Sequence, residues 1–365
     1  RPAAARTARR RTGRKKELNM EIRSIQHLRA IAALMVVVFH LHPQLARMGY
    51  EGAWPDWLSN GVDIFFVISG FIMWTTTAGR PITPMDFYRR RIVRIAPLYW
   101  LITSVVVAIM LAAPHLLQSA RFDLPHVLAS YAFIAWPSPA GHVEPVLVPG
   151  WTLNYEMFFY LVFGLALLLP ERRRLAATGL VLAALAAVGW WLRPASPAAG
   201  FYTSDIMLEF LAGMMLGRVY AGGRWPSHNA AGWLLVLAGL ALLAGSGAWP
   251  AGTSRLLQAG LPSILIVAGA LAIERARRTP AWPLLHRIGD ASYSLYLIHP
   301  LVLSALSQAW RKAGLGGTTA GMATFCLVAL AVSTLAGLAC HQLVERPLGQ
   351  RFARRRLPAT RATTG

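Results

Sequence analysis

Charged residues are scarce in this sequence, and acidic residues are the scarcest of them. Only 14% of the 365 residues are charged, with 15 Asp and Glu against 36 Lys and Arg. Soluble domains carry about 25% charged residues, whereas 55% of this chain is hydrophobic. With its repeated long apolar stretches, this composition excludes an ordinary soluble domain and predicts a polytopic helical membrane protein.

Cysteine is nearly absent as well. Cys326 and Cys340 fall in one expected helix, where a rise of 1.5 Å per residue separates them by roughly 21 Å. Because a disulfide requires Cα atoms within about 7 Å of each other, we expect no disulfide, no thiolate zinc site and no metal cofactor. The sequence also contains no Walker-type loop, no dinucleotide-binding fingerprint and no Gly-x-Ser-x-Gly elbow.

The excess of basic residues gives the chain a net charge of +21. Much of this charge lies in two terminal segments, 1–16 and 346–361, and in short loops. The positive-inside rule and attraction to anionic lipids explain the pattern better than a nucleic-acid partner does, so we expect contact with membrane lipids and no nucleic acid. The predicted organisation is a basic disordered tail at 1–21, a membrane domain at 22–347 and a basic tail at 348–365.

The apolar segments predict an all-α integral membrane protein, a bundle of about ten transmembrane helices with both termini cytoplasmic. With that count, the basic clusters at 89–94, 172–174 and 275–278 all fall on the cytoplasmic side. The apolar stretch 127–136 is too short to span and is interpreted as re-entrant or interfacial. No internal repeat is evident. The expected spans are 22–41, 60–77, 95–113, 151–169, 175–192, 206–220, 231–249, 256–273, 292–309 and 319–343.

The first span carries Arg29 near one end and His40 near the other. Eleven residues at about 100° each return to within roughly 20° of the same helix face, and they rise about 16 Å along the axis. Such side chains are costly inside a span and usually face the protein interior or a water-filled path. The spacing predicts a site that crosses the bilayer, with Arg29 toward the cytoplasm and His40 toward the other side.

Two carboxylates lie within expected spans. Asp63, near the outer end of the second span, is level with His40, and it is interpreted either as a cap of the helix start or as the group that orients His40. Glu156 lies among aromatic residues about a turn and a half into the fourth span, where an unpaired carboxylate is costly. We favour a functional role for Glu156 over structural pairing.

Arg91 and Arg94 share one helix face just before the third span. Taken alone they would be interpreted as positive-inside anchors. With Arg29 on the same side of the membrane they indicate a phosphate site, because guanidinium forks suit phosphate. His299, beside Pro300 at about mid-membrane, is interpreted as a structural histidine.

Several motifs, taken in order, point to one known family. They are Arg29 with His40 eleven residues on, the 61–70 stretch, Arg91-x-x-Arg94 before Pro97, the 151–160 and 292–300 stretches, and the closing Glu345-Arg346-Pro347. Together they resemble the membrane acyltransferase-3 family over about residues 22–347. The first span and the fourth are most similar to those of the rhizobial exopolysaccharide-production acetyltransferases of the succinoglycan type.

The resemblance implies an enzyme that transfers an acyl group, commonly acetyl from cytoplasmic acetyl-CoA, to a glycan hydroxyl at or outside the membrane. The donor substrate is then acetyl-CoA or another acyl-CoA. The resemblance also implies that His40 is the catalytic histidine and that Arg29, Arg91 and Arg94 belong to the donor site.

By the same resemblance, Glu156 and Asp63 match carboxylates of the family motifs and are counted as catalytic candidates. The implied acceptor is an exopolysaccharide, another cell-surface glycan or a lipid-linked oligosaccharide, and polysaccharide-export machinery is a candidate partner. The implied location is the bacterial inner membrane, which the chain crosses several times.

These expectations describe a general-base reaction. His40, with an unperturbed pKa near 6.5, would take the proton of a sugar hydroxyl while Asp63 or Glu156 holds its imidazole. An acyl-enzyme on His40 or Tyr155 remains an open alternative. The competing hypothesis is a polytopic glycan or lipid exporter without covalent chemistry, which intramembrane charges suit equally well. A non-catalytic scaffold would explain neither Glu156 nor His40.

Overall fold

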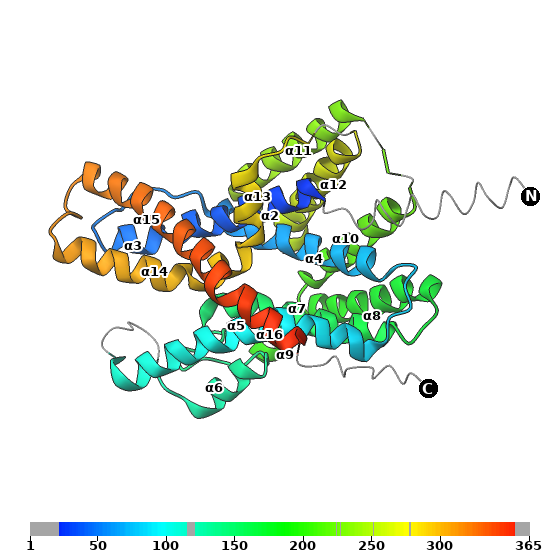
Figure 1. Cartoon of the computed structure of the whole chain (residues 1–365), viewed down its shortest axis with the longest axis horizontal. Coiled ribbons are helices and arrows are strands. Elements are labelled where there is room, and N and C mark those ends of the chain that lie inside the picture. Colours follow the sequence, from blue (N-terminus) through cyan, green and yellow to red (C-terminus); the bar gives the residue numbers. More distant parts are fainter. Residues whose placement is uncertain are drawn as a thin grey trace, which may run out of the picture.

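The computed structural model describes residues 22–114, 121–223, 225–226, 228–250, 252–276 and 279–354. Over these residues the regular structure is helical, apart from one isolated bridge between Pro137 and Val143 (Figure 1). The expected tail at 1–21, most of the tail at 348–365, and Arg277 and Arg278 lie outside the described residues.

Each of the ten segments expected to span the membrane is helical. By length and composition, seven of the described helices can cross a membrane; the count of ten and the cytoplasmic termini stay predictions. The helices are α2 (Arg23–Phe39), α3 (His42–Ala46), η1 (Asp56–Asn60), α4 (Gly61–Thr77), α5 (Pro84–Ala112), α6 (Leu124–Tyr131), η3 (Val148–Gly150), α7 (Trp151–Ala166), α8 (Glu171–Leu192), α9 (Pro197–Tyr202), α10 (Met207–Ala221), α11 (Asn229–Ala244), η4 (Gly245–Ala248), η5 (Leu256–Gly260), α12 (Leu261–Arg275), α13 (Pro283–Asp290), α14 (Ser292–Lys312), α15 (Thr319–Cys340), η6 (His341–Glu345) and α16 (Arg346–Arg354).

The basic run before the third expected span belongs to a helix and not to a loop. Helix α5 begins at Pro84, where the side-chain oxygen of Thr83 accepts a hydrogen bond from the backbone N–H of Asp86 at 3.1 Å. Proline at the first helical position is pre-organised for such a start. The helix therefore begins well before residue 95, the expected start of the span, because hydropathy detects where the apolar surface begins and not where the helix begins.

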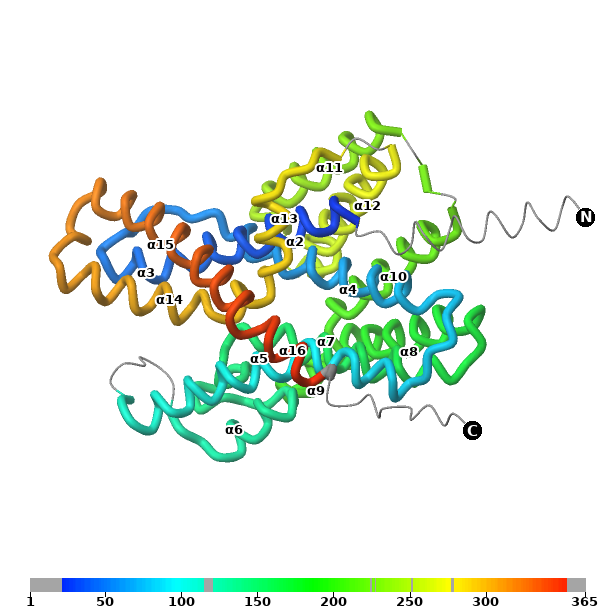
Figure 2. The backbone as a smooth tube through the Cα atoms, viewed as in Figure 1, coloured from blue at the N-terminus to red at the C-terminus, as the bar shows by residue number. Residues whose placement is uncertain are grey.

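Helix α2 lies at the centre of the bundle, in contact with α4, α12, α13 and α14 (Figure 1). Helix α13, which the sequence did not predict, packs closely on it. A Cβ atom at Gly289 would overlap the backbone carbonyl oxygen of Gln26, so the two backbones touch there. Figure 2 shows α14 and α15 running side by side, and α3 also contacts α14.

Helices α4 and α10 are held together through glycines. A Cβ atom at Gly70 would overlap the carbonyl oxygen of Phe210, and one at Gly213 would overlap that of Val67. Small residues allow this close approach between membrane helices. The tight pair gives α4 a fixed position beside α2, and the site lies next to both.

Candidate functional site

A cavity of about 290 Å³ lies between α2, α4, α5, α7 and α14. Its charged lining consists of Arg29, Arg91 and Arg94 with one carboxylate, Glu156. Four of the six candidate residues therefore meet at one place, although they come from three helices far apart in the sequence. The other polar residues of the lining are Gln26, Ser69, Thr152, Tyr160, Ser292, Tyr293 and Tyr296.

The three arginines differ in how deeply they are buried. Arg29 is only 9% exposed, and its Nη1 donates to the side-chain oxygen of Gln26 at 3.2 Å. Arg91 is half-buried, with its guanidinium 5.5 Å from the ring centre of Phe87 and 5.9 Å from that of Tyr160. Arg94 is exposed. The positive charge therefore extends from the surface of α5 into the interior.

Glu156 is fixed by two hydroxyl groups. Ser69 on α4 donates to its Oε1 at 2.6 Å, and Tyr160 donates to the same oxygen from one turn further along α7. No carboxylate in the described part of the chain forms an ion pair with Arg29, Arg91 or Arg94. Three guanidinium groups against one carboxylate leave the cavity positively charged, and such groups suit phosphate.

His40 lies at the end of α2 and is held by its own helix. Its Nδ1 donates to the backbone oxygen of Val36 at 2.8 Å, which leaves the lone pair on Nε2 in the neutral ring. The expectation that Asp63 or Glu156 holds this imidazole was wrong, because a backbone carbonyl does so. The ring also contacts His299, with 4.8 Å between ring centres.

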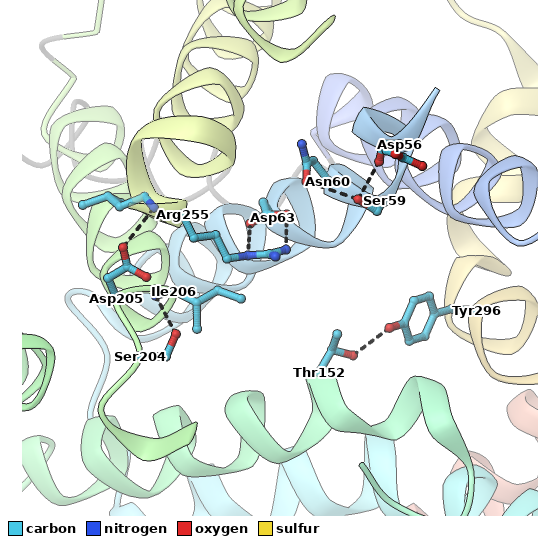
Figure 3. Close-up of polar contacts among 11 residues, drawn as sticks. Asp56, Ser59, Asn60, Asp63, Thr152, Ser204, Asp205, Ile206, Arg255 and Tyr296 are labelled. Carbon is cyan, nitrogen blue, oxygen red and sulfur yellow. Dashed lines mark hydrogen bonds and ion pairs between the residues drawn. The ribbon is translucent and has the colours of Figure 1, made fainter. Parts of the chain in front are cut away.

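His40 does not line the arginine cavity. Ring contacts connect the two: Tyr296 lines the cavity, and its ring centre lies 6.0 Å from that of His299, which contacts His40. The hydroxyl of Tyr296 is hydrogen-bonded to Thr152 at 3.0 Å (Figure 3). The cavity and His40 are thus connected through Tyr296 and His299 of α14.

Asp63 has a partner of its own, away from His40. Both of its oxygens accept hydrogen bonds from Arg255, at 3.0 and 2.8 Å (Figure 3). Asp63 is fully buried in the first turn of α4, and Arg255 immediately precedes η5. Asp205 accepts from the backbone N–H of Leu256 at 3.2 Å, which also anchors this helix start.

Arg255 was missed in the sequence, although a single arginine directly before an apolar run was a visible signal. The buried acid Glu209 of α10 was missed too, and it interacts with Asp63 and Arg255. The interpretation of Asp63 as the orienting group of His40 is therefore corrected. Asp63 instead ties α4 to the beginning of η5 and α12.

Comparison with known proteins shows what the chain is similar to. A family model described as an acyltransferase domain matches residues 22–338. The exopolysaccharide production protein ExoZ of Rhizobium meliloti is 39% identical, over 82% of this chain and 92% of that protein. Acyltransferase MdmB of Streptomyces mycarofaciens is 27% identical, over 83% of this chain and 84% of its own.

A further relative shares only part of its length with this chain. The peptidoglycan O-acetyltransferase OatA of Listeria monocytogenes is 28% identical over 40% of this chain and 24% of its own length. No solved structure matches the chain. The matched region at 22–338 contains every residue that lines the arginine cavity, together with His40 and His299.

Proposed function

Because this chain belongs to the membrane acyltransferase-3 family, we propose that it transfers an acetyl or other short acyl group from cytoplasmic acyl-CoA to a hydroxyl of an exopolysaccharide or another cell-surface glycan. The proposal places the enzyme in the bacterial inner membrane as a multi-pass protein. The enzyme would take the acyl donor from the cytoplasmic side of the membrane and the glycan acceptor from the other side.

The arginine cavity is the observation that carries the donor assignment. CoA bears several phosphate groups, and Arg29, Arg91 and Arg94 supply guanidinium groups with no ion-pair partner in the described chain. Guanidinium binds phosphate through two parallel hydrogen bonds. The exposed Arg94 would meet the phosphates first, and the pantetheine arm would extend past the buried Arg29 toward Tyr296.

The names of the relatives support the acceptor assignment. ExoZ is described as an exopolysaccharide production protein and OatA as a peptidoglycan O-acetyltransferase. Both descriptions concern surface polysaccharides, and an O-acetyltransferase acts on a hydroxyl group. A glycan hydroxyl that reaches the free Nε2 of His40 would be correctly placed for proton removal. A lipid-linked precursor of the glycan would present the same hydroxyl.

In the proposed reaction His40 is the general base. Its Nε2 takes the proton of the acceptor hydroxyl while that oxygen attacks the thioester carbonyl carbon. A C–O ester bond forms, the C–S bond breaks, and CoA leaves as a thiolate that takes up a proton. The backbone oxygen of Val36 fixes the ring, and Glu156 offsets part of the cavity charge without touching His40. A positioned base contributes about 10²–10⁴ in rate.

A direct test uses the purified full-length chain in liposomes. It is supplied with acetyl-CoA and exopolysaccharide from which acetyl esters have been removed by mild alkali. Free CoA is measured with a thiol reagent, and acetyl esters on the glycan are measured by mass spectrometry. The expected result is one ester formed for each CoA released.

The competing exporter hypothesis predicts a different result from the same liposomes. An exporter would move glycan or lipid across the bilayer without consuming the thioester. Glycan movement with no release of CoA would overturn the proposed function. Ester formation from another acyl donor, but not from acyl-CoA, would overturn the donor assignment alone.

A further inference from the structure

Glu209 is a buried carboxyl group that the reaction described above leaves without a task. It lies in the first turn of α10 and is fully buried. In the described part of the chain, neither of its oxygens accepts a hydrogen bond and it forms no ion pair. An isolated carboxylate in an apolar interior is so costly that such a group usually becomes neutral. The position of Glu209 therefore needs an explanation.

The explanation begins with the carboxyl group of Asp63, which is also fully buried. The side chains of Glu209 and Asp63 lie within hydrogen-bonding distance of each other. Two carboxylate ions can only accept hydrogen bonds, and at such a distance they repel each other. A single proton turns the same contact into a hydrogen bond, because a protonated carboxyl group donates through its O–H. The contact is therefore favourable only when one of the two groups is protonated.

The charges around the pair indicate which group carries the proton. Arg255 donates to both oxygens of Asp63, which stabilises the ionised form of that residue (Figure 3). Asp205, just before α10, adds a further negative charge nearby, and Tyr155 of α7 adds a phenol that is neutral at neutral pH. One guanidinium group cannot neutralise two buried carboxylates. The negative charge thus belongs to Asp63 and the proton to Glu209.

The pair lies at a joint between helices, next to the arginine cavity. Glu209 packs against the π-helix η5, where a Cβ atom at Gly260 would lie 3.1 Å from its Oε1. Helices of the π type are rare and occur frequently at functional sites. Val62, which precedes Asp63 in α4, lines the cavity. A change in the pair can therefore reach the cavity through α4.

We propose that Glu209 holds a proton and donates it in a hydrogen bond to Asp63, which makes the joint between α4, α10 and η5 depend on pH. In the protonated state one carboxylate faces one guanidinium group. When the proton leaves to water, two carboxylates repel each other beside Arg255 and the joint loosens. This inference does not depend on the proposed function.

The matched substitution is Glu209→Gln, whose amide N–H can donate to Asp63 but cannot release a proton. Above the ordinary glutamate pKa of about 4.3, the native wild type holds one proton that the unfolded chain has lost, so its stability falls as the pH rises. Between about pH 5 and pH 7, its unfolding equilibrium constant should rise about tenfold more per pH unit than that of Glu209→Gln. The measurement is denaturant unfolding of the full-length chain in detergent. Equal slopes would overturn the proposal.

Asp205→Asn is the control for the loss of a neighbouring acid. Asp205 is half-buried and accepts from the backbone N–H of Leu256 at 3.2 Å, and the side-chain oxygen of asparagine can accept the same bond. This variant should keep the pH slope of the wild type. Sodium chloride and choline chloride are also compared at constant pH. Stabilisation by sodium alone would mean that a cation, and not a proton, lies between the carboxylates, and would overturn the proposal.

A second measurement uses the wild type and remains informative if Glu209→Gln does not fold. Infrared spectra are recorded at neutral pH in a detergent without ester groups, with and without glutamate labelled with a heavy carbon isotope. A protonated carboxyl group has a C=O stretching band at higher frequency than carboxylate and amide bands, and this band should shift on labelling. Absence of the band, or a band that shifts with labelled aspartate instead, would remove the proton from Glu209.

Discussion

Arg255 and Arg29 are both arginines within the helical bundle, but their surroundings differ. Arg255 donates two hydrogen bonds to the buried carboxylate of Asp63. Arg29 donates to the neutral amide of Gln26 and, with Arg91 and Arg94, faces a cavity. The guanidinium of Arg255 is neutralised by the protein, whereas the cavity arginines are available to a ligand. Electrostatic surroundings, and not residue type, distinguish the paired Arg255 from the arginines that we propose bind the donor.

The comparison predicts different readouts for the two regions. Substitutions at the Asp63–Arg255 pair should alter stability, and substitutions at the cavity and at His40 should alter binding or rate.

The largest effect is expected for His40→Gln. Glutamine keeps much of the size and hydrogen-bonding capacity of histidine, but its amide cannot accept a proton as a base does. The variant should fold and bind acyl-CoA, yet lose about 10²–10⁴ in transfer rate. The measurement is turnover of the purified protein. His42→Gln, two residues further along, is the control, and activity of His40→Gln within a few-fold of wild type would remove His40 from the mechanism.

The next effect is on stability, for Asp63→Ala. Removing one partner of a buried ion pair costs about 3–5 kcal/mol. Because the side chain of Arg255 is 38% exposed, we expect about 3 kcal/mol, the lower end of that range. The measurement is thermal or denaturant unfolding. The control variant is Asp56→Ala, because Asp56 is exposed. Unchanged stability with lost turnover would instead support a catalytic role of Asp63.

A smaller effect, on donor affinity, is expected for Arg94→Ala. Loss of one guanidinium–phosphate contact should raise the KM for acyl-CoA about tenfold, which corresponds to about 1.4 kcal/mol. Lysine should restore affinity only partly, because it keeps the charge and loses the fork. Arg90→Ala is the control, since Arg90 is exposed on the same helix and does not line the cavity. An unchanged KM would leave Arg94 as a topology anchor.

The smallest effect is expected for Ser69→Ala. This change removes one of the two hydroxyl groups that donate to Glu156, and Tyr160 still holds the carboxylate. We expect a loss of about 1 kcal/mol, in unfolding free energy or in donor binding. The measurement combines unfolding with titration of CoA. A loss as large as that of Asp63→Ala would mean that Glu156 depends on Ser69 far more than its geometry indicates.

Family membership and the positions of most of the long helices were predictable from the sequence. The order of motifs from Arg29 to Glu345-Arg346-Pro347 led to the acyltransferase-3 family, which the family match at 22–338 confirms. Apolar length located α4 to within one residue, because a membrane span must be apolar over most of its length. The segment α13 escaped detection because its hydrophobic face is short and packs on α2.

The all-helical membrane class and the family could be predicted from the sequence, and so could the spacing of charged residues along a helix, because apolar length and helical rise are local quantities. Which charges meet could not be predicted, because it depends on how the helices pack together. Asp63 and His40 were expected at similar depth, but Asp63 turns to Arg255 while His40 turns to His299. Rotation of a helix about its axis is set by packing against its neighbours, and depth along the axis carries no information about that rotation.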